Sequence, residues 1–181
     1  HIEEGRGKKT ALIYDSPITG NKSQLSFNEL RSKVSKFAGA LKDQGVVKGD
    51  RVIIYMPMIP EAIIAMQAVA RIGAVHSVVF GGFSADSLAT RIQDAEAKVV
   101  ITADGGFRKG KATALKPAVD QALADHKCPT VEHVLVVNRT GQDVDWDDSV
   151  DVWWEEQMQS VDAEHVAVGF NAEHPLFILY T

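Results

Sequence analysis

The chain has 181 residues, of which 45% are hydrophobic and 24% are charged, and its formal net charge is −5 at pH 7. This length suits one domain with a sizeable core, and the acidic balance argues against nucleic acid or an anionic membrane as a partner. No apolar run approaches the length of a membrane span. The single cysteine, Cys128, excludes an internal disulfide framework and fits a reducing compartment, so we expect a cytoplasmic protein.

The N-terminal part predicts a β-hairpin followed by a helix. Residues 10–15 and 24–26 are typical of two strands around a polar turn. Ser26 can cap the helix, and Glu29, three residues on, completes a capping box. Gly45 suits the end of this helix. Its apolar residues recur at three- and four-residue steps and make one stripe: Phe27, Leu30, Val34, Phe37, Ala38 and Leu41.

From residue 51 onward, short apolar runs alternate with amphipathic stretches. Strands are predicted over 51–56, 74–80, 98–103 and 132–138, and helices over 60–71, 84–95 and 113–125. Pro60 and Pro117 suit the first turns of the helices in which they lie, and Ser84 suits an N-cap. Strands that are apolar throughout indicate a parallel sheet covered on both faces. We therefore predict an α/β fold with a doubly wound, mostly parallel sheet and flanking helices, in which residues 50–138 form a βαβαβαβ core.

The last part of the chain predicts a surface connection over 139–151 and a short helix near 152–159. The final stretch, "HPLFILYT" (174–181), is typical of a buried strand, on which a domain seldom ends. His1 is not a methionine and no signal-peptide pattern follows it. We therefore expect the chain to be a piece of a longer protein.

Two loops follow strands and could bind a ligand, because ligands of open α/β sheets lie beyond the carboxyl ends of the strands. In "FGGFS" (80–84), Gly81 and Gly82 let backbone amides approach an anion at the start of a helix. The alternative is a tight turn that binds nothing.

The second loop, "ADGGFRKGKATALK" (103–116), carries four basic residues and no acid between Gly105 and Val119. We expect its glycines, Gly105, Gly106 and Gly110, to keep the loop open. Arg108, Lys109, Lys111 and Lys116 would then converge on a polyphosphate. The alternative is a solvated basic loop. Together the two loops favour a nucleotide-like ligand.

Other candidates are weaker. His76 lies within a buried strand pattern and suits a core histidine better than a ligand, and Trp153 and Trp154 suit anchors of a short helix better than a pocket wall. No histidine or cysteine spacing suits a metal site, so none is predicted. The aspartates of 139–151 lack the pattern of a calcium loop and suit a solvated acidic loop: Asp145, Asp147, Asp148 and Asp151.

These segments resemble the AMP-forming acetyl-CoA synthetases and their propionyl-CoA relatives. The resemblance is carried by residues 49–92, which include "YMPM" and "SVVFGGFS", and continues through "KVVITADGG", "RKGK", "RTGQDVDW" and "DVWW" to "NAEHPLFILYT". It covers nearly the whole chain and is specific within the adenylate-forming superfamily. It implies that residues 1–181 are part of the large N-terminal AMP-binding domain, and that Thr181 begins the phosphate loop for ATP.

The resemblance also implies a two-step reaction. ATP converts acetate to acetyl-adenylate with Mg²⁺ screening the phosphates, and the thiol of coenzyme A (CoA) then displaces AMP. The family's "RxGR" phosphate-binding stretch falls on Arg108, Lys109, Gly110 and Lys111, and Phe80, Gly81 and Gly82 fall beside the CoA adenine. Lys111 stands where the family commonly has arginine, and Lys109 where it commonly has a small residue. These departures leave the detailed geometry open.

The family's catalytic elements lie in parts that this chain does not contain, so the resemblance implies no catalytic residue within it and no activity of the fragment alone. The partners would be acetate, ATP, CoA and the remainder of its own protein. A propionate–CoA ligase of the same family is one alternative. A non-catalytic CoA- or nucleotide-binding module is an alternative of another class.

Overall fold

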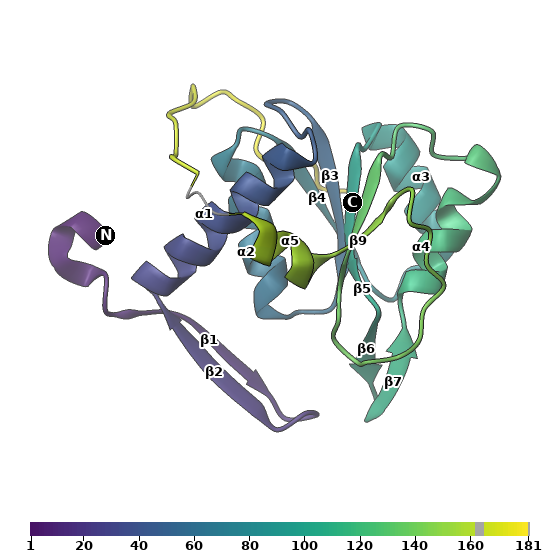
Figure 1. The fold of residues 1–181 in the computed structure, drawn as a ribbon, viewed down its shortest axis with the longest axis horizontal. Helices are drawn as coiled ribbons and strands as arrows, with labels where there is room; N and C mark the ends of the chain where they lie inside the picture. Colours follow the sequence, from purple (N-terminus) through teal and green to yellow (C-terminus); the bar gives the residue numbers. More distant parts are fainter. Residues whose placement is uncertain (162–164, 181) are drawn as a thin grey trace.

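A computed structural model describes residues 1–161 and 165–180 of the chain. At its centre lies a five-stranded sheet in the order β4-β3-β5-β8-β9, with every neighbouring pair parallel (Figure 1). The strands are β3 (Arg51–Met56), β4 (Val75–Phe80), β5 (Val99–Ala103), β8 (His133–Val137) and β9 (Asp151–Trp153). The predicted parallel sheet is thus confirmed. Strand β9 is an addition, because three residues are too few to show a pattern in the sequence.

Helices cover both faces of this sheet, as predicted for a doubly wound fold. In Figure 1, α1, α2 and α5 lie on one side of the sheet and α3 and α4 on the other. Their bounds are α1 (Phe27–Asp43), α2 (Pro60–Arg71), α3 (Ala85–Ala95), α4 (Lys116–Leu123) and α5 (Trp154–Ser160). A 3₁₀ turn (Ala124–His126) follows α4, and a short helical turn (Ile2–Arg6) precedes the antiparallel hairpin of β1 (Thr10–Ser16) and β2 (Asn21–Ser26).

Helices α1, α2 and α3 begin where their sequences predict. The Ser26 hydroxyl accepts from the backbone N–H of Glu29 at 3.3 Å, and the Glu29 carboxylate accepts from the Ser26 backbone N–H at 2.7 Å. This reciprocal pair is the predicted capping box. Pro60 lies in the first turn of α2, and the Ser84 hydroxyl accepts from Ser87 N–H at the start of α3. Local capping therefore sets the helix boundaries that follow β2 and β4.

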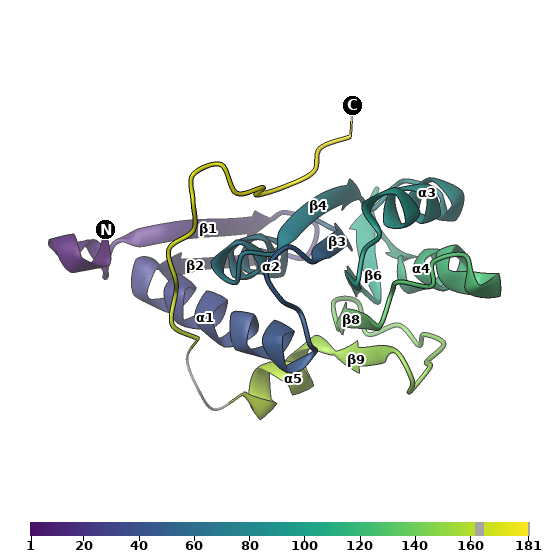
Figure 2. The ribbon, with the colours of Figure 1, turned by 90° about the horizontal axis from the view of Figure 1, so that it is seen from above.

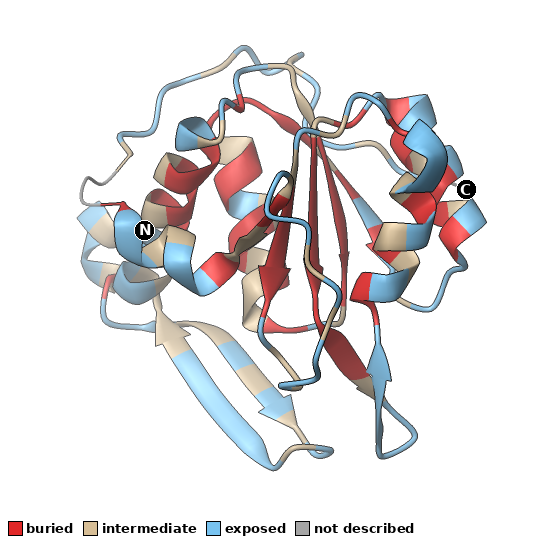
Figure 3. Ribbon diagram, turned by 45° about the vertical axis from the view of Figure 1, so that its right-hand side comes forward, coloured by how far each residue is buried: buried red, intermediate tan, exposed pale blue. Residues whose placement is uncertain are grey.

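Most of the core is formed by the central strands and by the helix faces turned toward them (Figure 3). Strands β3, β5 and β8 are buried over nearly their whole length, which explains their continuous apolar sequence. On one face, the Phe37 ring of α1 stacks on Trp154 of α5 with centroids 3.7 Å apart. Trp154 is thus confirmed as an anchor, whereas the half-buried Trp153 stacks on Trp146 at 4.4 Å.

The structure corrects the prediction after β5. Residues expected to form an open glycine loop instead make an antiparallel hairpin, β6 (Gly105–Arg108) and β7 (Lys111–Ala114). Lys109 and Gly110 form its two-residue turn with φ of 51° and 77°, the positive values that such turns require. Helix α4 consequently begins at Lys116 and not at 113. The helix-like composition of 113–115 is overridden by pairing with β6.

The predicted buried strand at 174–180 is also wrong. This segment makes one isolated bridge, between Phe177 and His76 of the edge strand β4. Leu176, Phe177 and Leu179 are exposed. Figure 2 shows the segment from residue 165 onward running past α1 and α2 to reach this edge. The apolar pattern is real, but these side chains are not enclosed by other described residues.

Among the helices in the described part of the chain, none combines the length and apolar character needed to cross a bilayer.

Candidate functional site

A pocket of about 340 Å³ lies beyond the carboxyl ends of β3 and β4. Its walls come from the turn after β3, the loop between β4 and α3, the β6–β7 hairpin and the start of α4. The lining residues are Tyr55, Pro57, Phe80, Gly81, Gly82, Phe83, Gly106, Phe107, Arg108, Thr113, Ala114, Leu115 and Ala118. The pocket therefore brings together the two segments that the sequence singled out, at the edge of the sheet where ligands are expected.

The loop between β4 and α3 supplies an aromatic wall. The rings of Phe80 and Phe83 meet edge to face, with centroids 6.2 Å apart. The Tyr55 hydroxyl donates to the Phe83 carbonyl at 2.9 Å and thereby fixes the loop to β3. Burial raises the pKa of Tyr55 above its ordinary value. A Cβ atom at Gly82 would lie 2.5 Å from the exposed Phe80 ring, so a side chain at this position would displace that ring from its place in the wall.

The predicted basic residues are only partly brought together. Arg108 lines the pocket, whereas Lys109, Gly110 and Lys111 form the exposed tip of the hairpin beside it. Lys116 does not join them, which corrects the prediction of four converging cations. Its side chain is 2% exposed and pairs with Asp120 and Asp151. The site thus carries one guanidinium at the pocket and two ammonium groups close by.

Asp104 fixes the base of the hairpin. Its fully buried carboxylate accepts hydrogen bonds from the backbone N–H groups of Gly105 (2.6 Å), Arg139 (2.8 Å) and Thr140 (2.9 Å), and from the Thr140 hydroxyl (2.8 Å). Its backbone carbonyl accepts from Leu115 N–H at 3.0 Å, at the far end of the hairpin. Burial alone would raise the pKa of Asp104, but these hydrogen bonds lower it overall.

Replacing Asp104 with asparagine should lower the free energy of unfolding by about 1–3 kcal/mol at neutral pH, because an amide cannot accept all these bonds. Since the folded-state pKa lies below the ordinary 3.8, the stabilisation is present above that pH and is lost as the pH falls through the folded-state pKa. Urea unfolding at several pH values measures this difference, with the exposed Asp43→Asn as control. A difference that stays constant into acid would contradict the role of the carboxylate.

Sequence reasoning missed several residues of the pocket. Tyr55 lies next to the last residue of β3, and Pro57 directly follows that strand. The rule that ligands lie beyond the carboxyl ends of strands already applied there, so the sequence carried a signal for both. Phe107 and Leu115 were hidden because the hairpin itself was not predicted. Their recognition needed the two-residue Lys109–Gly110 turn, whose lysine is an unusual choice at positive φ.

The remaining candidates lie outside this pocket. Within residues 1–161 and 165–180, histidine, cysteine and carboxylate side chains form no group of three suited to a metal. Burial lowers the pKa of the half-buried His76. Asp151, predicted to lie in a solvated loop, is buried against Lys116. Thr181 lies outside the described residues.

Comparison with known proteins places these features in context. The family model described as "AMP-binding enzyme" matches residues 2–181. The chain is 61% identical to an acetyl-coenzyme A synthetase of Streptomyces coelicolor over its whole length, which is 27% of that protein. It is 49% identical to an acetyl-coenzyme A synthetase of Salmonella typhimurium, again over the whole chain and 28% of the relative. An acetoacetyl-CoA synthetase structure from Streptomyces lividans matches all of this chain, and 27% of its own, at 31% identity and a TM-score of 0.87.

Proposed function

The chain belongs to the AMP-binding enzyme family, and from this we propose that it forms part of the N-terminal domain of a cytoplasmic AMP-forming acetate–CoA ligase. The observation that carries the proposal is identity of 49–61% with acetyl-coenzyme A synthetases along the entire chain. The chain spans about a quarter of the length of those relatives, so the activity is proposed for the full-length protein containing it. The chain alone is expected to be inactive.

The proposed reaction makes acetyl-CoA in two steps. A carboxylate is a poor electrophile, so an acetate oxygen first attacks the α-phosphorus of ATP, which gives acetyl-adenylate and releases pyrophosphate. The CoA thiol then attacks the acetyl carbon, and AMP leaves with the electron pair of the broken C–O bond. Mg²⁺ is proposed to screen the phosphates of ATP, and we assign to this chain neither a ligand of that ion nor a catalytic residue.

The pocket is proposed to bind the nucleotide end of CoA. Its aromatic wall, with Phe80 beside Gly81 and Gly82, offers a face for adenine stacking. Arg108 borders the pocket, and its guanidinium can donate two parallel N–H hydrogen bonds to a phosphate. Lys109 and Lys111 add positive charge at the exposed tip of the hairpin, where Gly110 completes the two-residue turn. Lys111 keeps the charge of an arginine but loses the bidentate fork.

The test is ATP–pyrophosphate exchange by the full-length protein, run in parallel with acetate and propionate. Faster exchange with acetate is the expected result, because the relatives named above are acetyl-coenzyme A synthetases. A preference for propionate would move the protein to the alternative substrate and leave the proposed CoA site in place. No exchange with either acid would overturn the proposed activity and favour a non-catalytic module that binds CoA or a nucleotide.

A further inference from the structure

The β6–β7 hairpin carries the proposed phosphate contacts but has little support of its own. It is a separate two-stranded sheet, and such a hairpin is marginally stable unless other elements hold it. Its glycine base is buried, whereas residues 108–114 are exposed. Phe107 lies between these two parts and is half-buried. The position of Arg108 at the pocket therefore depends on what contacts the middle of the hairpin.

Arg139 makes that contact. Its guanidinium carbon lies over the Phe107 ring, 5.7 Å from the centroid, and also over the Tyr14 ring at 5.7 Å. Its Nη2 atom donates to the Tyr14 hydroxyl at 2.6 Å. The Nε atom is buried and finds no hydrogen-bond partner among the described residues. Partial desolvation strengthens the attraction of a cation to aromatic faces. Arg139 thus joins the β6–β7 hairpin to the N-terminal hairpin β1–β2.

The backbone of Arg139 is held by the same carboxylate that holds the hairpin base. Asp104 accepts from Arg139 N–H at 2.8 Å and from Gly105 N–H at 2.6 Å. The strand that begins at Gly105 and the residue that contacts its middle are therefore fixed relative to each other. A planar guanidinium suits stacking on aromatic rings in a way that an ammonium group does not.

We propose that Arg139 is a positioning residue for the CoA site: it holds Phe107, and through it the neighbouring Arg108, in the arrangement that binds the CoA phosphates. This inference rests on the proposed function. Arg139 itself does not line the pocket, so its effect on ligand binding passes through the hairpin. The adenylation step, which does not use CoA, is independent of it.

The test compares Arg139→Ala, Arg139→Lys and Tyr14→Phe in the full-length protein. Arg139→Ala should raise the KM for CoA roughly fivefold to thirtyfold and leave the rate of ATP–pyrophosphate exchange unchanged. Arg139→Lys should restore part of the loss, and Tyr14→Phe, which keeps the ring, should have a smaller effect. Amide hydrogens of β6 and β7 should exchange faster in Arg139→Ala, while those of β3 and β5 keep their protection.

The matched control is Arg51→Ala. Arg51 donates to the Ala95 carbonyl at 2.6 Å and to the Glu96 carboxylate at 3.1 Å, away from the hairpin. Its loss should reduce stability without changing the KM for CoA. An unchanged KM in Arg139→Ala, in a protein whose KM responds to Arg108→Ala, would overturn the positioning role and leave the proposed function standing. Absence of exchange and of CoA-dependent turnover in the unmodified protein would overturn both.

Discussion

Replacing Lys116 with methionine should lower the free energy of unfolding by about 3–5 kcal/mol, because it removes one partner from a buried ion pair. The Lys116 side chain is 2% exposed and that of Asp151 is 1% exposed. The ammonium lies 2.7 Å from a carboxylate oxygen of Asp151 and 2.5 Å from one of Asp120. The Asp151 carboxylate is therefore shielded from water, whereas the Asp120 side chain is 36% exposed and can be partly hydrated.

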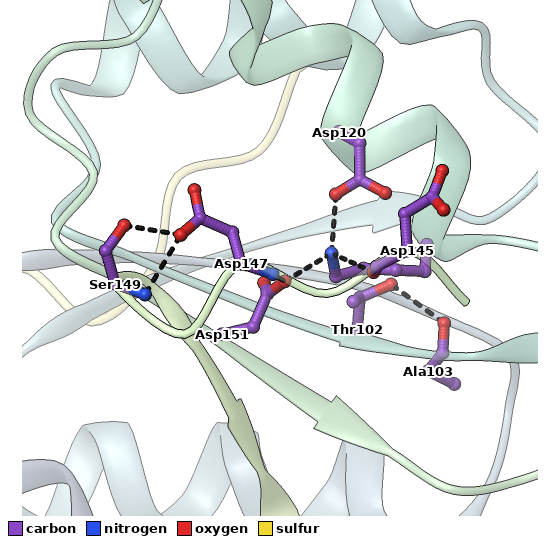
Figure 4. A network of polar contacts seen from close by, with 8 residues as sticks. Thr102, Ala103, Asp120, Asp145, Asp147, Ser149 and Asp151 are labelled. Carbon is purple, nitrogen blue, oxygen red and sulfur yellow. Dashed lines mark hydrogen bonds and ion pairs between the residues drawn. The ribbon is translucent and has the colours of Figure 1, made fainter. Parts of the chain in front are cut away.

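The contacts around this lysine explain why the effect is large. Figure 4 shows the carboxylates of Asp120 and Asp151 pointing toward the same point, from α4 and from the start of β9. In each carboxylate, the oxygen that does not contact Lys116 is buried without a hydrogen-bond partner among the described residues. The Asp151 oxygen that contacts Lys116 also accepts from Asp147 N–H at 2.9 Å. Lys116 is therefore the main compensation for two carboxylates and ties α4 to β9.

Urea unfolding of the full-length protein measures the prediction. Lys127→Met, at an exposed lysine after α4, is the control and should change the free energy of unfolding by less than about 0.5 kcal/mol. The double variant Lys116→Met with Asp151→Leu should recover part of the loss, because it removes the uncompensated charge as well. A loss below about 1 kcal/mol in the single variant would show that the pair is not buried as described.

The elements predicted correctly are those whose signals are local. The apolar runs over 51–56 and 99–103 form buried strands as predicted, and the Ser26–Glu29 capping box sets the start of α1 within four residues. Pro60 is a local signal of the same kind, and it lies in the first turn of α2 as predicted. Because parallel strands need long crossovers, the alternation of strands and helices also predicted the sheet type.

Two of the misses, at Lys116 and Arg139, depend on contacts between residues that are distant in the chain. Lys116 was grouped with the hairpin cations because its partner Asp151 lies 35 residues further on. Arg139 was not predicted as a functional residue, because the aromatic rings that it contacts belong to β1 and β6. The stretch 174–180 was predicted as a buried strand from composition alone, whereas burial requires neighbours on both sides. Within the pocket, the sequence predicted the loop over 80–84 together with Gly106 and Arg108, whereas Phe107 and Leu115 required the hairpin.

Replacing Arg108 with alanine should have the largest effect on ligand use. We expect the KM for CoA to rise roughly 10- to 150-fold, which corresponds to the loss of about 1.5–3 kcal/mol from a charge-assisted hydrogen bond. Lys111 pairs with Arg108 across the hairpin but is exposed and does not line the pocket. Lys111→Ala should therefore raise the KM only about twofold to fivefold.

Steady-state kinetics with varied CoA measures these effects, and ATP–pyrophosphate exchange measures the first step separately. Arg31→Ala removes an exposed arginine from α1 and is the charge-matched control. Exchange should stay near its original rate in all three variants, because acetyl-adenylate forms before CoA reacts. Equal losses in exchange and in CoA use would contradict a CoA-specific site. Equal effects of Arg108→Ala and Arg31→Ala would mean that net charge, and not the pocket, governs CoA binding.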